Sequence, residues 1–306
     1  MQTVVQAPPQ SPKRLTLWLA LASVYILWGS TYLFIHFMTE HMPPLYMASM
    51  RFLVAGGLLY GYARLTGAPR PTWTHVRSAG LVGLLLLGLA NGSVTVAVHY
   101  IPTGVAAMIA ALVPVFLLSL NWVTFAKTRP SNLALAGLLL GLLGVYLLIK
   151  PDKFQSANTA SNNLIGGLLV LLADVAWAVG TLLSPRLPLP SPFLSSGIQM
   201  LVAALALFLV SMATEPVTPL SILNAPPEAL GAMAYLVVFG SIIGFSSYAW
   251  LARNAPPALV STYAYVNPVI AMLLGTLFAG EVFRSQSLIG AGIVVAGVVL
   301  ITLGRK

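Results

Sequence analysis

The sequence predicts an all-α membrane protein with ten transmembrane helices, arranged as two inverted repeats of five helices. The first observation behind this fold class is the scarcity of charge, since the 306 residues include only 15 Lys and Arg and 6 Asp and Glu. A soluble chain of this length carries about 76 charged residues, taking roughly 25% as usual. The second is an apolar content of 58%, against roughly 45–50% in soluble globular proteins. The charges are too few to cover a soluble surface, and the apolar content excludes disorder.

Apolar segments of membrane length recur along the whole chain. A hydrocarbon core about 30 Å thick requires about 20 helical residues per crossing, and only helices and closed barrels satisfy their backbone groups there. Prolines mark most joints between segments, as at Met42-Pro43-Pro44 and Ala225-Pro226-Pro227. The ten predicted spans are 16–38, 44–65, 75–99, 101–124, 131–149, 163–184, 191–213, 229–252, 257–279 and 286–303.

The basic residues orient these spans, because cytoplasmic loops carry an excess of Lys and Arg. With the N-terminus in the cytoplasm, eleven basic residues fall on the inner side, three fall on the outer side, and Arg51 lies within the second span. We therefore predict that both termini are cytoplasmic. The chain has no run of five or more Lys or Arg, so we expect no nucleic-acid partner. The inner residues are Lys13, Arg14, Arg64, Arg70, Arg77, Lys127, Arg129, Arg186, Arg253, Arg305 and Lys306, and the outer residues are Lys150, Lys153 and Arg284.

A weak internal repeat relates the two halves of the chain. With an offset of 154 residues, Pro102 matches Pro256 and Pro114 matches Pro268. Two halves of five spans enter the membrane from opposite sides, which predicts inverted-topology repeats, an arrangement common in secondary transporters. The predicted organisation is a cytoplasmic tail at 1–15, a first five-helix repeat at 16–150, a linker at 151–163 and a second five-helix repeat at 164–304.

Two ionisable side chains lie within predicted spans, where unpaired polar groups are costly. Asp174 is the only acid well inside a span, and burying it ionised costs about 2.5–3.5 kcal/mol on insertion scales. It is interpreted as a proton site or the partner of a substrate ammonium group, or else as a packing residue between helices. Arg51 is interpreted as snorkelling to the interface, with a substrate carboxylate or Asp174 as the alternative partner.

Trp28 and Trp177 each lie inside the first span of a half, away from the interfacial belts where Trp is usual. In that position an indole ring can stack on an apolar or aromatic substrate. The alternative is helix packing beside small residues, such as the Ser30 and Thr31 that follow Trp28. All four are candidate lining residues of a substrate cavity.

Pro114 and Pro268 lie inside predicted spans at matching positions of the two halves. A proline in a helix frees the carbonyl about one turn earlier, which here lies near Ala110 and near Ala264. Unwound helices at matching positions point to a transporter's binding site, and we prefer this interpretation to a static kink because both halves show the feature. The remaining candidate lining residues are Asn91, Ser93, Tyr248, Tyr263, Tyr265 and Asn267.

Two further groups of residues have structural interpretations. Trp18, Trp122 and Trp250 lie at cytoplasmic span ends and are assigned to the aromatic belt. The glycines of spans five and ten allow close helix packing; they are Gly137, Gly141, Gly144, Gly290, Gly292 and Gly297. We therefore expect those two helices to form a structural spine.

Several short motifs resemble those of a known transporter family. They are Trp28-Gly29-Ser30-Thr31-Tyr32, Asn91-Gly92, Pro114, Tyr263-Ala264-Tyr265-Val266-Asn267-Pro268 and Gly280-Glu281. Over about residues 16 to 304, the chain resembles the EamA-type ten-helix branch of the drug/metabolite transporter superfamily. Within that branch it is most similar to bacterial inner-membrane amino-acid and drug exporters, including the aromatic amino-acid exporter group. The resemblance implies two inverted five-helix repeats, a central substrate cavity and alternating access.

The chain departs from the family at one position. Family members often carry a Glu at the end of the fourth helix, corresponding to Glu281 in the second half, and this chain has Lys127 there. A mechanism that needs both acids therefore does not apply. With Asp174 as a single buried acid, proton coupling and facilitated diffusion both stay open.

We therefore predict an inner-membrane transporter that exports amino acids, including aromatic ones, and related small metabolites through a largely uncharged cavity. The alternatives are a multidrug or nucleotide-sugar-like carrier of the same fold and a channel, for which no filter motif is visible. A membrane-embedded enzyme would need clustered acids, histidines or metal ligands. The chain has no Cys, and we expect no cofactor and no metal. The expected partners are a small-molecule substrate and the lipid bilayer, and the sequence is compatible with a monomer.

Overall fold

The structure is a computed structural model that describes residues 14–39, 41–97, 100–101, 106, 109–149, 160–216, 225–279 and 285–304. Within these residues the regular elements are all helices, which confirms the prediction of an all-α protein. Four helical segments in this part of the chain are long and apolar enough to cross a membrane. They are Trp73–Ala97, Leu164–Arg186, Pro192–Thr214 and Pro227–Asn254.

The helix bounds lie within a few residues of most predicted spans. The first half contains α1 (Arg14–Thr39), α2 (Pro44–Leu65), α3 (Trp73–Gly83) continued by η1 (Leu84–Asn91) and α4 (Gly92–Ala97), α6 (Val113–Leu120) continued by η2 (Asn121–Phe125), and α7 (Asn132–Ile149). The second half contains α8 (Ala160–Leu183) and η4 (Ser184–Arg186), α9 (Pro192–Thr214), α10 (Pro227–Tyr235) continued by η5 (Leu236–Phe245) and α11 (Ser246–Asn254), α12 (Pro257–Val260), α13 (Tyr263–Ala279) and α14 (Ser285–Leu303).

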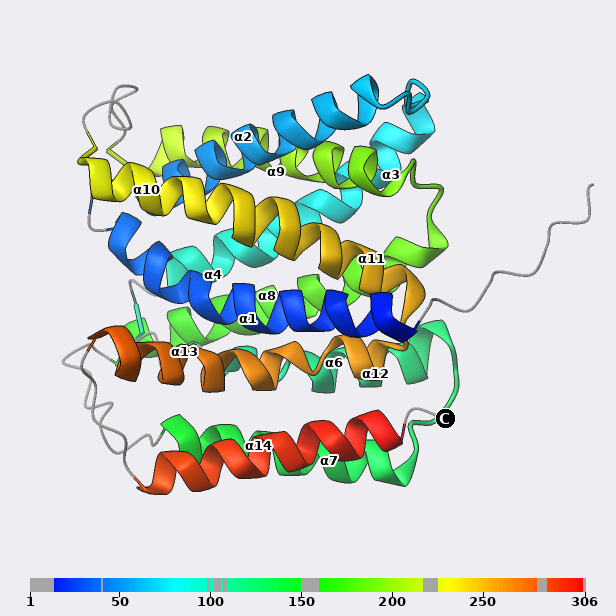
Figure 1. The fold of residues 1–306 in the computed structure, drawn as a ribbon, viewed down its shortest axis with the longest axis vertical. Helices are drawn as coiled ribbons and strands as arrows, with labels where there is room; N and C mark the ends of the chain where they lie inside the picture. Colours follow the sequence, from blue (N-terminus) through cyan, green and yellow to red (C-terminus); the bar gives the residue numbers. More distant parts are fainter. Residues whose placement is uncertain are drawn as a thin grey trace, which may run out of the picture.

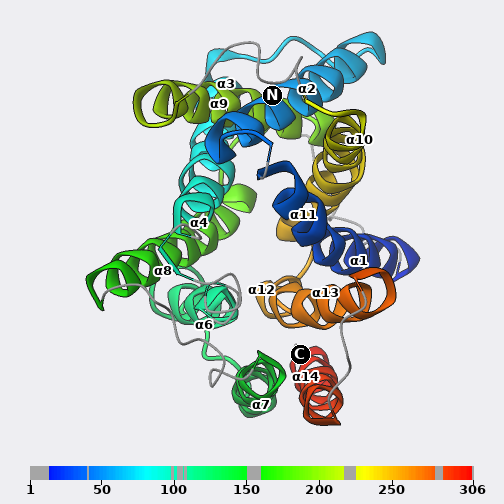
Figure 2. The ribbon, with the colours of Figure 1, turned by 90° about the vertical axis from the view of Figure 1, so that its left-hand side faces the viewer.

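The helices lie side by side and form a bundle (Figure 1). At one edge of the bundle α7 packs along α14, and near the opposite edge α2 packs along α9. Between these pairs, α1 contacts α13 and η5, while α8 contacts α6 and η1. Seen along the helices, α1, α11 and α13 lie on one side of the bundle, and α4, α8 and α6 lie on the other (Figure 2).

Glycines bring α7 and α14 into backbone contact. A Cβ atom added at Gly144 would lie 2.7 Å from the backbone nitrogen of Val294, and one added at Gly297 would lie 2.7 Å from that of Gly141. Real Cβ atoms do not come so close to a backbone, so only glycine permits this spacing. The interpretation of Gly144 and Gly297 as close-packing positions is confirmed, whereas that of Gly292 is wrong, because nothing lies within 4 Å of a Cβ atom added there.

A π-helical segment interrupts a long helix in each half. η1 lies between α3 and α4, and η5 lies between α10 and α11. With the offset of 154 residues, the last residue of η1, Asn91, matches the last residue of η5, Phe245. π-Helices are rare and frequent at functional sites. Hydropathy does not distinguish them from α-helix, so they were not anticipated from the sequence.

The helix predicted at 257–279 breaks earlier than Pro268 indicates. The chain leaves the helical path at Ser261–Thr262, more than one turn before the proline, and α13 continues through Pro268. Ser261 Oγ donates to the carbonyl oxygen of Ala258 at 3.0 Å, and Thr262 Oγ1 donates to that of Leu259 at 2.6 Å. Hydroxyl groups that bond nearby carbonyls compete with the helical ladder. In the first half, by contrast, the turn at Ala111–Leu112 directly precedes Pro114, as expected.

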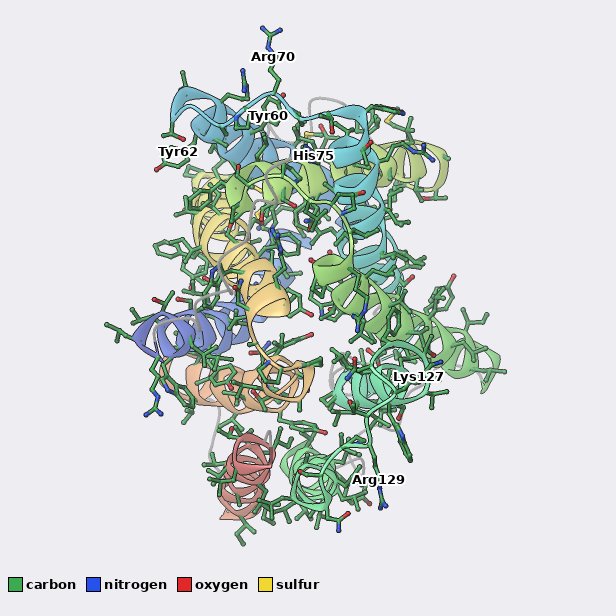
Figure 3. All side chains as sticks on the ribbon, turned by 90° about the vertical axis from the view of Figure 1, so that its right-hand side faces the viewer. Tyr60, Tyr62, Arg70, His75, Lys127 and Arg129 are labelled. Carbon is green, nitrogen blue, oxygen red and sulfur yellow. The ribbon has the colours of Figure 1, made fainter. Side chains whose placement is uncertain are left out.

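The described basic residues other than Arg51 gather at one end of the bundle, which we call the basic end. α1 begins and α14 ends there (Figure 1), and Arg70, Lys127 and Arg129 stand at its surface (Figure 3). At the opposite end, Glu215 follows α9 and Glu228 lies in the first turn of α10. The residues of the basic end are Arg14, Arg64, Arg70, Arg77, Lys127, Arg129, Arg186 and Arg253. Lys13, Lys150, Lys153, Arg284, Arg305 and Lys306 lie outside the described residues.

Candidate functional site

Four aromatic rings meet between the two halves of the chain, and we call them the aromatic cluster. They are Trp28, Trp177, Tyr248 and Tyr263, from α1, α8, α11 and α13 in that order. The centroid of the Trp28 ring lies 5.5 Å from Trp177, 5.0 Å from Tyr248 and 5.2 Å from Tyr263. Tyr248 lies 5.0 Å from Trp177 and 5.5 Å from Tyr263. Several of these pairs are edge to face, the arrangement that aromatic quadrupoles favour. The structure thus brings together four candidates that are far apart in the sequence.

Hydrogen bonds fix two rings of the aromatic cluster. Trp28 Nε1 donates to the carbonyl oxygen of Gly240 in η5 at 3.1 Å. Thr181 Oγ1 donates to the carbonyl oxygen of Trp177 at 2.7 Å and lies 2.5 Å from the hydroxyl of Tyr248. A threonine hydroxyl has a single proton, so Tyr248 is the donor in the second bond. Thr181 was not anticipated from the sequence, although its spacing of one helical turn from Trp177 was a usable signal.

Asp174 lies one turn before Trp177 on α8, on the same side of the helix. Its side chain is 2% exposed, and Oδ2 has no hydrogen-bond partner in the structure. A buried polar atom without a partner is costly, and it marks a place where a proton, a water molecule or a ligand donor can bind. The other described acids, Glu215 and Glu228, lie at the end of the bundle opposite the basic end.

Arg51 does not reach an interface, so the snorkelling interpretation is wrong. Its side chain is 6% exposed, and Nε donates to Ser241 Oγ in η5 at 2.7 Å. A Cβ atom added at Gly240 would lie 2.8 Å from Nη2 of Arg51. Arg51 and Trp28 therefore approach the same glycine of η5. The guanidinium of Arg51 lies beside the Cα atom of Gly240, and the indole N–H of Trp28 binds the carbonyl oxygen of Gly240. The structure pairs Arg51 with Ser241, and not with Asp174, the alternative partner considered from the sequence.

Ser30 and Thr31 take part in helix contacts of α1. Ser30 Oγ donates to the carbonyl oxygen of Leu27 at 2.8 Å and lies 2.6 Å from the hydroxyl of Tyr235 on α10. Thr31 Oγ1 donates to the carbonyl oxygen of Trp28 at 2.7 Å. Both side chains are buried. They support the position of α1 beside α10 and η5, and neither joins the aromatic cluster.

Tyr265 and Asn267 also lie away from the aromatic cluster. Tyr265 is fully buried, its hydroxyl donates to the carbonyl oxygen of Leu138 at 3.3 Å, and its ring lies against Gly141. With its amide nitrogen turned toward them, Asn267 donates to the carbonyl oxygens of Tyr263 at 3.2 Å and Tyr25 at 3.3 Å. Tyr265 therefore joins α13 to α7, and Asn267 joins α13 to α1. Tyr265 follows Tyr263 by two residues and so points to another side of α13, whereas Asn267 lies one turn further along the helix, where its amide meets α1.

The remaining candidates lie on elements that pack against α8. Asn91 ends η1 and Ser93 follows it in α4, where its side chain is 8% exposed. Pro114 is buried in the first turn of α6. Gly280 and Glu281 lie outside the described residues, whereas Lys127 is described and is exposed at the basic end. Among the residues that the structure describes, no group of three or more His, Cys, Asp or Glu side chains is placed to hold a metal ion.

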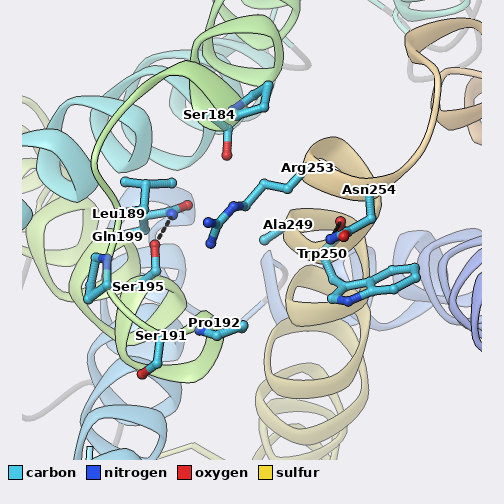
Figure 4. Close-up of a pocket in the computed structure, with 12 residues that line it drawn as sticks. Ser184, Leu189, Ser191, Pro192, Ser195, Gln199, Ala249, Trp250, Arg253 and Asn254 are labelled. Carbon is cyan, nitrogen blue, oxygen red and sulfur yellow. Dashed lines mark hydrogen bonds between the residues drawn. The ribbon is translucent and has the colours of Figure 1, made fainter. Parts of the chain in front are cut away.

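Two cavities open at the basic end and share Pro185 and Arg253. The first, which we call the α9 cavity, has a volume of about 520 Å³ and lies between η4, the start of α9 and the end of α11 (Figure 4). The second, which we call the α6 cavity, has a volume of about 440 Å³, and its lining includes Asn121 at the start of η2, Ala126 just after η2, and Thr181. Because Thr181 binds Tyr248, the α6 cavity reaches the edge of the aromatic cluster. From the sequence, Arg253 was interpreted only as a topology signal, and its role in lining both cavities was missed.

Comparisons with known proteins match nearly the whole chain. The model of the EamA-like transporter family matches residues 14–150 and 164–303. The uncharacterized inner membrane transporter YedA of Escherichia coli K12 is 41% identical over 94% of this chain and 90% of its own length. The probable amino-acid metabolite efflux pump of Salmonella typhimurium is 25% identical over 92% of this chain and 93% of its own length.

A solved crystal structure has the same fold, with a TM-score of 0.77, 20% sequence identity, and coverage of 96% of this chain and 98% of its own. The family match covers both halves of the chain. The family and the two relatives are transporters, and not enzymes. Two of the helices that carry the aromatic cluster, those with Trp177 and Tyr248, lie in segments long and apolar enough to cross a membrane. The chain therefore belongs to the EamA-like transporter family and is a membrane transporter.

Proposed function

We propose that this transporter exports amino acids, aromatic ones among them, and related small metabolites by alternating access through the aromatic cluster. The observation that carries the proposal is the contact of Trp28 and Trp177, from the first helix of each half, with Tyr248 and Tyr263. Aromatic rings offer an apolar face to a substrate ring and attract a cation such as an ammonium group. The name of the Salmonella relative, a probable amino-acid metabolite efflux pump, supports this substrate class.

The proposal includes ten membrane-crossing helices in two inverted repeats, at 16–150 and 164–304, joined by a linker at 151–163. The helix neighbours support this arrangement, since α1 packs on α13 and η5 just as α8 packs on α6 and η1. The pairs α2 with α9 and α7 with α14 join corresponding helices of the two halves. The matching positions of η1 and η5 agree with it. Inverted repeats form their binding site at the repeat interface, where the aromatic cluster lies.

In the proposed orientation, the basic end faces the cytoplasm and the protein lies in the bacterial inner membrane. The excess of Lys and Arg at that end supports the orientation, because cytoplasmic loops are enriched in basic residues. The name of the relative YedA, an inner membrane transporter, supports the location. Both cavities open at the basic end. The described conformation then corresponds to the state in which an exporter loads its substrate.

Asp174 is the proposed partner of the substrate ammonium group. Its Oδ2 atom is buried without a hydrogen-bond partner, one turn of α8 from Trp177. Arg51 is the proposed partner of the substrate carboxylate, because it contacts Gly240, whose carbonyl oxygen binds Trp28. An amino acid presents both groups and so satisfies an acid and a base that would otherwise stay costly in the membrane.

A second candidate function is export of cationic organic compounds. Asp174 and four aromatic rings suffice to bind an organic cation, and Arg51 is already bonded to Ser241. In this alternative Arg51 is structural and the substrate carries no carboxylate. The two candidates differ in one property that an assay can measure, which is whether transport depends on the carboxylate of the substrate.

Counterflow into proteoliposomes loaded with unlabelled substrate tests the proposal. We expect exchange of labelled L-phenylalanine without any ion gradient, and weaker exchange of phenethylamine, which lacks the carboxylate. Trp177→Ala should lower exchange at least ten-fold, because it removes a face of the aromatic cluster. Trp122→Ala is the matched control, since Trp122 is 43% exposed at the basic end and outside the cluster.

The result separates the two candidates. Exchange of phenethylamine or of a cationic drug, with no exchange of any amino acid by folded protein, would refute amino-acid export and support the second candidate. Equal loss in Trp177→Ala and Trp122→Ala would show that the aromatic cluster is not the site.

A further inference from the structure

The α9 cavity contains polar groups that no part of the transport path described so far uses. Its wall combines side chains from η4, the first turns of α9 and the last turn of α11. In Figure 4 the Ser195 hydroxyl and the Gln199 amide lie on one side of it, and the Arg253 guanidinium faces them from the other. The polar residues among its lining are Ser184, Ser191, Ser195, Gln199, Arg253 and Asn254.

Arg253 is the cation of this cavity. Its side chain extends from α11 toward Ser195 and Gln199 (Figure 4). The described carboxylates do not line this cavity: Glu215 and Glu228 lie at the other end of the bundle, and Asp174 is buried on α8 one turn before Trp177. Arg186, in the α6 cavity, differs: it donates to the carbonyl oxygen of Leu182 and lies 4.7 Å from the centroid of the Phe125 ring. Arg253 thus remains available for an anionic group, whereas Arg186 is held by its surroundings.

The start of α9 adds to the attraction for an anion. Ser191 is the N-cap of this helix of 23 residues, and its side chain makes no capping hydrogen bond. Ser191 and Pro192 both line the cavity. The N-terminus of a helix carries a partial positive charge and free N–H groups. A carboxylate beside Arg253 therefore lies near a second electropositive group.

Gln199 supplies an acceptor for a cationic group. The residue is 1% exposed, and its Nε2 atom donates to Ser195 Oγ at 2.9 Å. That bond directs the amide, and it leaves Oε1 buried without a hydrogen-bond partner. A buried amide oxygen in this state is costly until it receives a donor. The three donors of an ammonium group meet that need.

We propose that the α9 cavity is an entrance site that binds the zwitterionic head of an amino acid, with the carboxylate on Arg253 and the ammonium group on Gln199 Oε1. The inference rests on the proposed function, and it adds a second binding site at the basic end, ahead of the aromatic cluster. Opposite charges on the ligand match separate groups of the cavity, so an amine alone or an acid alone satisfies only half of it. The site therefore selects amino acids before they reach the transport path.

The absence of cysteine in the chain allows a direct test. In Ser191→Cys, a single thiol lies at the rim of the α9 cavity, where the serine side chain has no capping role. The rate of its reaction with N-ethylmaleimide is measured in nanodiscs at increasing concentrations of L-phenylalanine, phenethylamine and 3-phenylpropionate. We expect L-phenylalanine to protect the thiol at a concentration about ten-fold lower than either analogue, since each analogue lacks one charge-assisted hydrogen bond.

Second substitutions in this background assign the two charges. Arg253→Gln should raise the half-protecting concentration of L-phenylalanine and 3-phenylpropionate about ten-fold and leave that of phenethylamine unchanged. Gln199→Leu should raise the half-protecting concentrations of L-phenylalanine and phenethylamine and leave that of 3-phenylpropionate unchanged. Arg70→Gln is the matched control, because Arg70 is exposed at the basic end and lines neither cavity. The unchanged response to phenethylamine also shows that Arg253→Gln is folded.

Counterflow of L-phenylalanine by the same proteins separates this inference from the proposed function. If L-phenylalanine is exchanged but its protection of the thiol is the same in Arg253→Gln, the entrance site is wrong and amino-acid export stands. If protection depends on Arg253 but no amino acid is exchanged, the entrance site stands and amino-acid export is wrong. Protection of a thiol placed by Arg70→Cys, outside the cavity, would also overturn the entrance site.

Discussion

The hydroxyl of Tyr248 donates a hydrogen bond to Oγ1 of Thr181, with 2.5 Å between the two oxygens. The bond joins α11 to α8 and lies between two environments. Tyr248 is fully buried in the aromatic cluster, whereas Thr181 also lines the α6 cavity. The pair therefore joins the wall of the α6 cavity to the aromatic cluster.

The two members of this pair are expected to respond differently to substitution. Thr181→Val leaves the buried hydroxyl of Tyr248 without an acceptor, which costs about 1–3 kcal/mol. Tyr248→Phe leaves Thr181 bonded to the carbonyl oxygen of Trp177 and strands no polar group. We expect the melting temperature in detergent to fall clearly for Thr181→Val and little for Tyr248→Phe.

The double variant supplies the control for that prediction. In the double variant Thr181→Val with Tyr248→Phe, both hydroxyl groups are absent and no polar group is left without a partner. The double variant is therefore expected to recover most of the stability that Thr181→Val alone loses. A loss in the double variant equal to the sum of the two single losses would contradict the assigned direction of the bond.

Asp174→Asn is expected to raise the KM for L-phenylalanine in counterflow about ten-fold. The reason is the loss of a charge-assisted hydrogen bond to the substrate ammonium group. The analogue 3-phenylpropionate lacks that group, so its KM in counterflow should be the same in the variant and in the parent protein. An imposed proton gradient supplies the contrasting outcome: if Asp174→Asn abolishes only gradient-driven accumulation and leaves exchange intact, Asp174 is a proton site instead.

The sequence predicted the helices and part of the site, because both depend on local pattern. Hydropathy placed the helix bounds, and Trp28 and Trp177 were identified from their position inside a span rather than at its end. Tyr263 and Tyr265 looked equivalent in the sequence, but only the structure fixes which helix face meets the other half. Single-helix periodicity does not contain that information, since it depends on how the helices pack.

The missed features depend on contacts between distant segments. Thr181 matters through Tyr248, Arg51 through Ser241, and Gln199 through the cavity that η4 and α11 complete. None of these pairs is close in the sequence. The early break of the ninth span, by contrast, had a local signal in the consecutive hydroxyls of Ser261 and Thr262. From the sequence, the break was assigned to Pro268 instead, because a proline inside a helix is the more familiar cause of a break.

The contact of α7 with α14 predicts a marked difference between two glycines. Gly144→Ala places a Cβ atom 2.7 Å from the backbone of Val294 and should destabilise the protein by about 1–3 kcal/mol through overpacking. Gly292→Ala is the matched control, because nothing lies within 4 Å of its added Cβ atom, and a helical alanine is favourable there. Thermal unfolding in detergent compares them, and equal melting temperatures would contradict the close contact.

Glu215 is expected to stabilise the pair formed by α2 and α9. Its Oε1 accepts from the backbone N–H of Leu45 at 2.8 Å, and its Oε2 accepts from that of Tyr46 at 3.0 Å and from Ser211 Oγ at 2.6 Å. A carboxylate from α9 thus caps the N-terminus of α2, whose own N-cap, Pro43, has no side-chain cap.

Glu215→Gln should therefore lower the stability of the protein by about 1–2 kcal/mol, the usual worth of a helix cap. A glutamine amide keeps one acceptor oxygen, and its NH₂ group would face a backbone N–H group of α2, so the substitution cannot reproduce both bonds. Glu228→Gln is the matched control, since Glu228 is exposed in the first turn of α10 at the same end of the bundle. Thermal unfolding of both variants at neutral pH measures the difference. If the melting temperature fell as far in Glu228→Gln as in Glu215→Gln, the loss would reflect the charge of that end and not the cap.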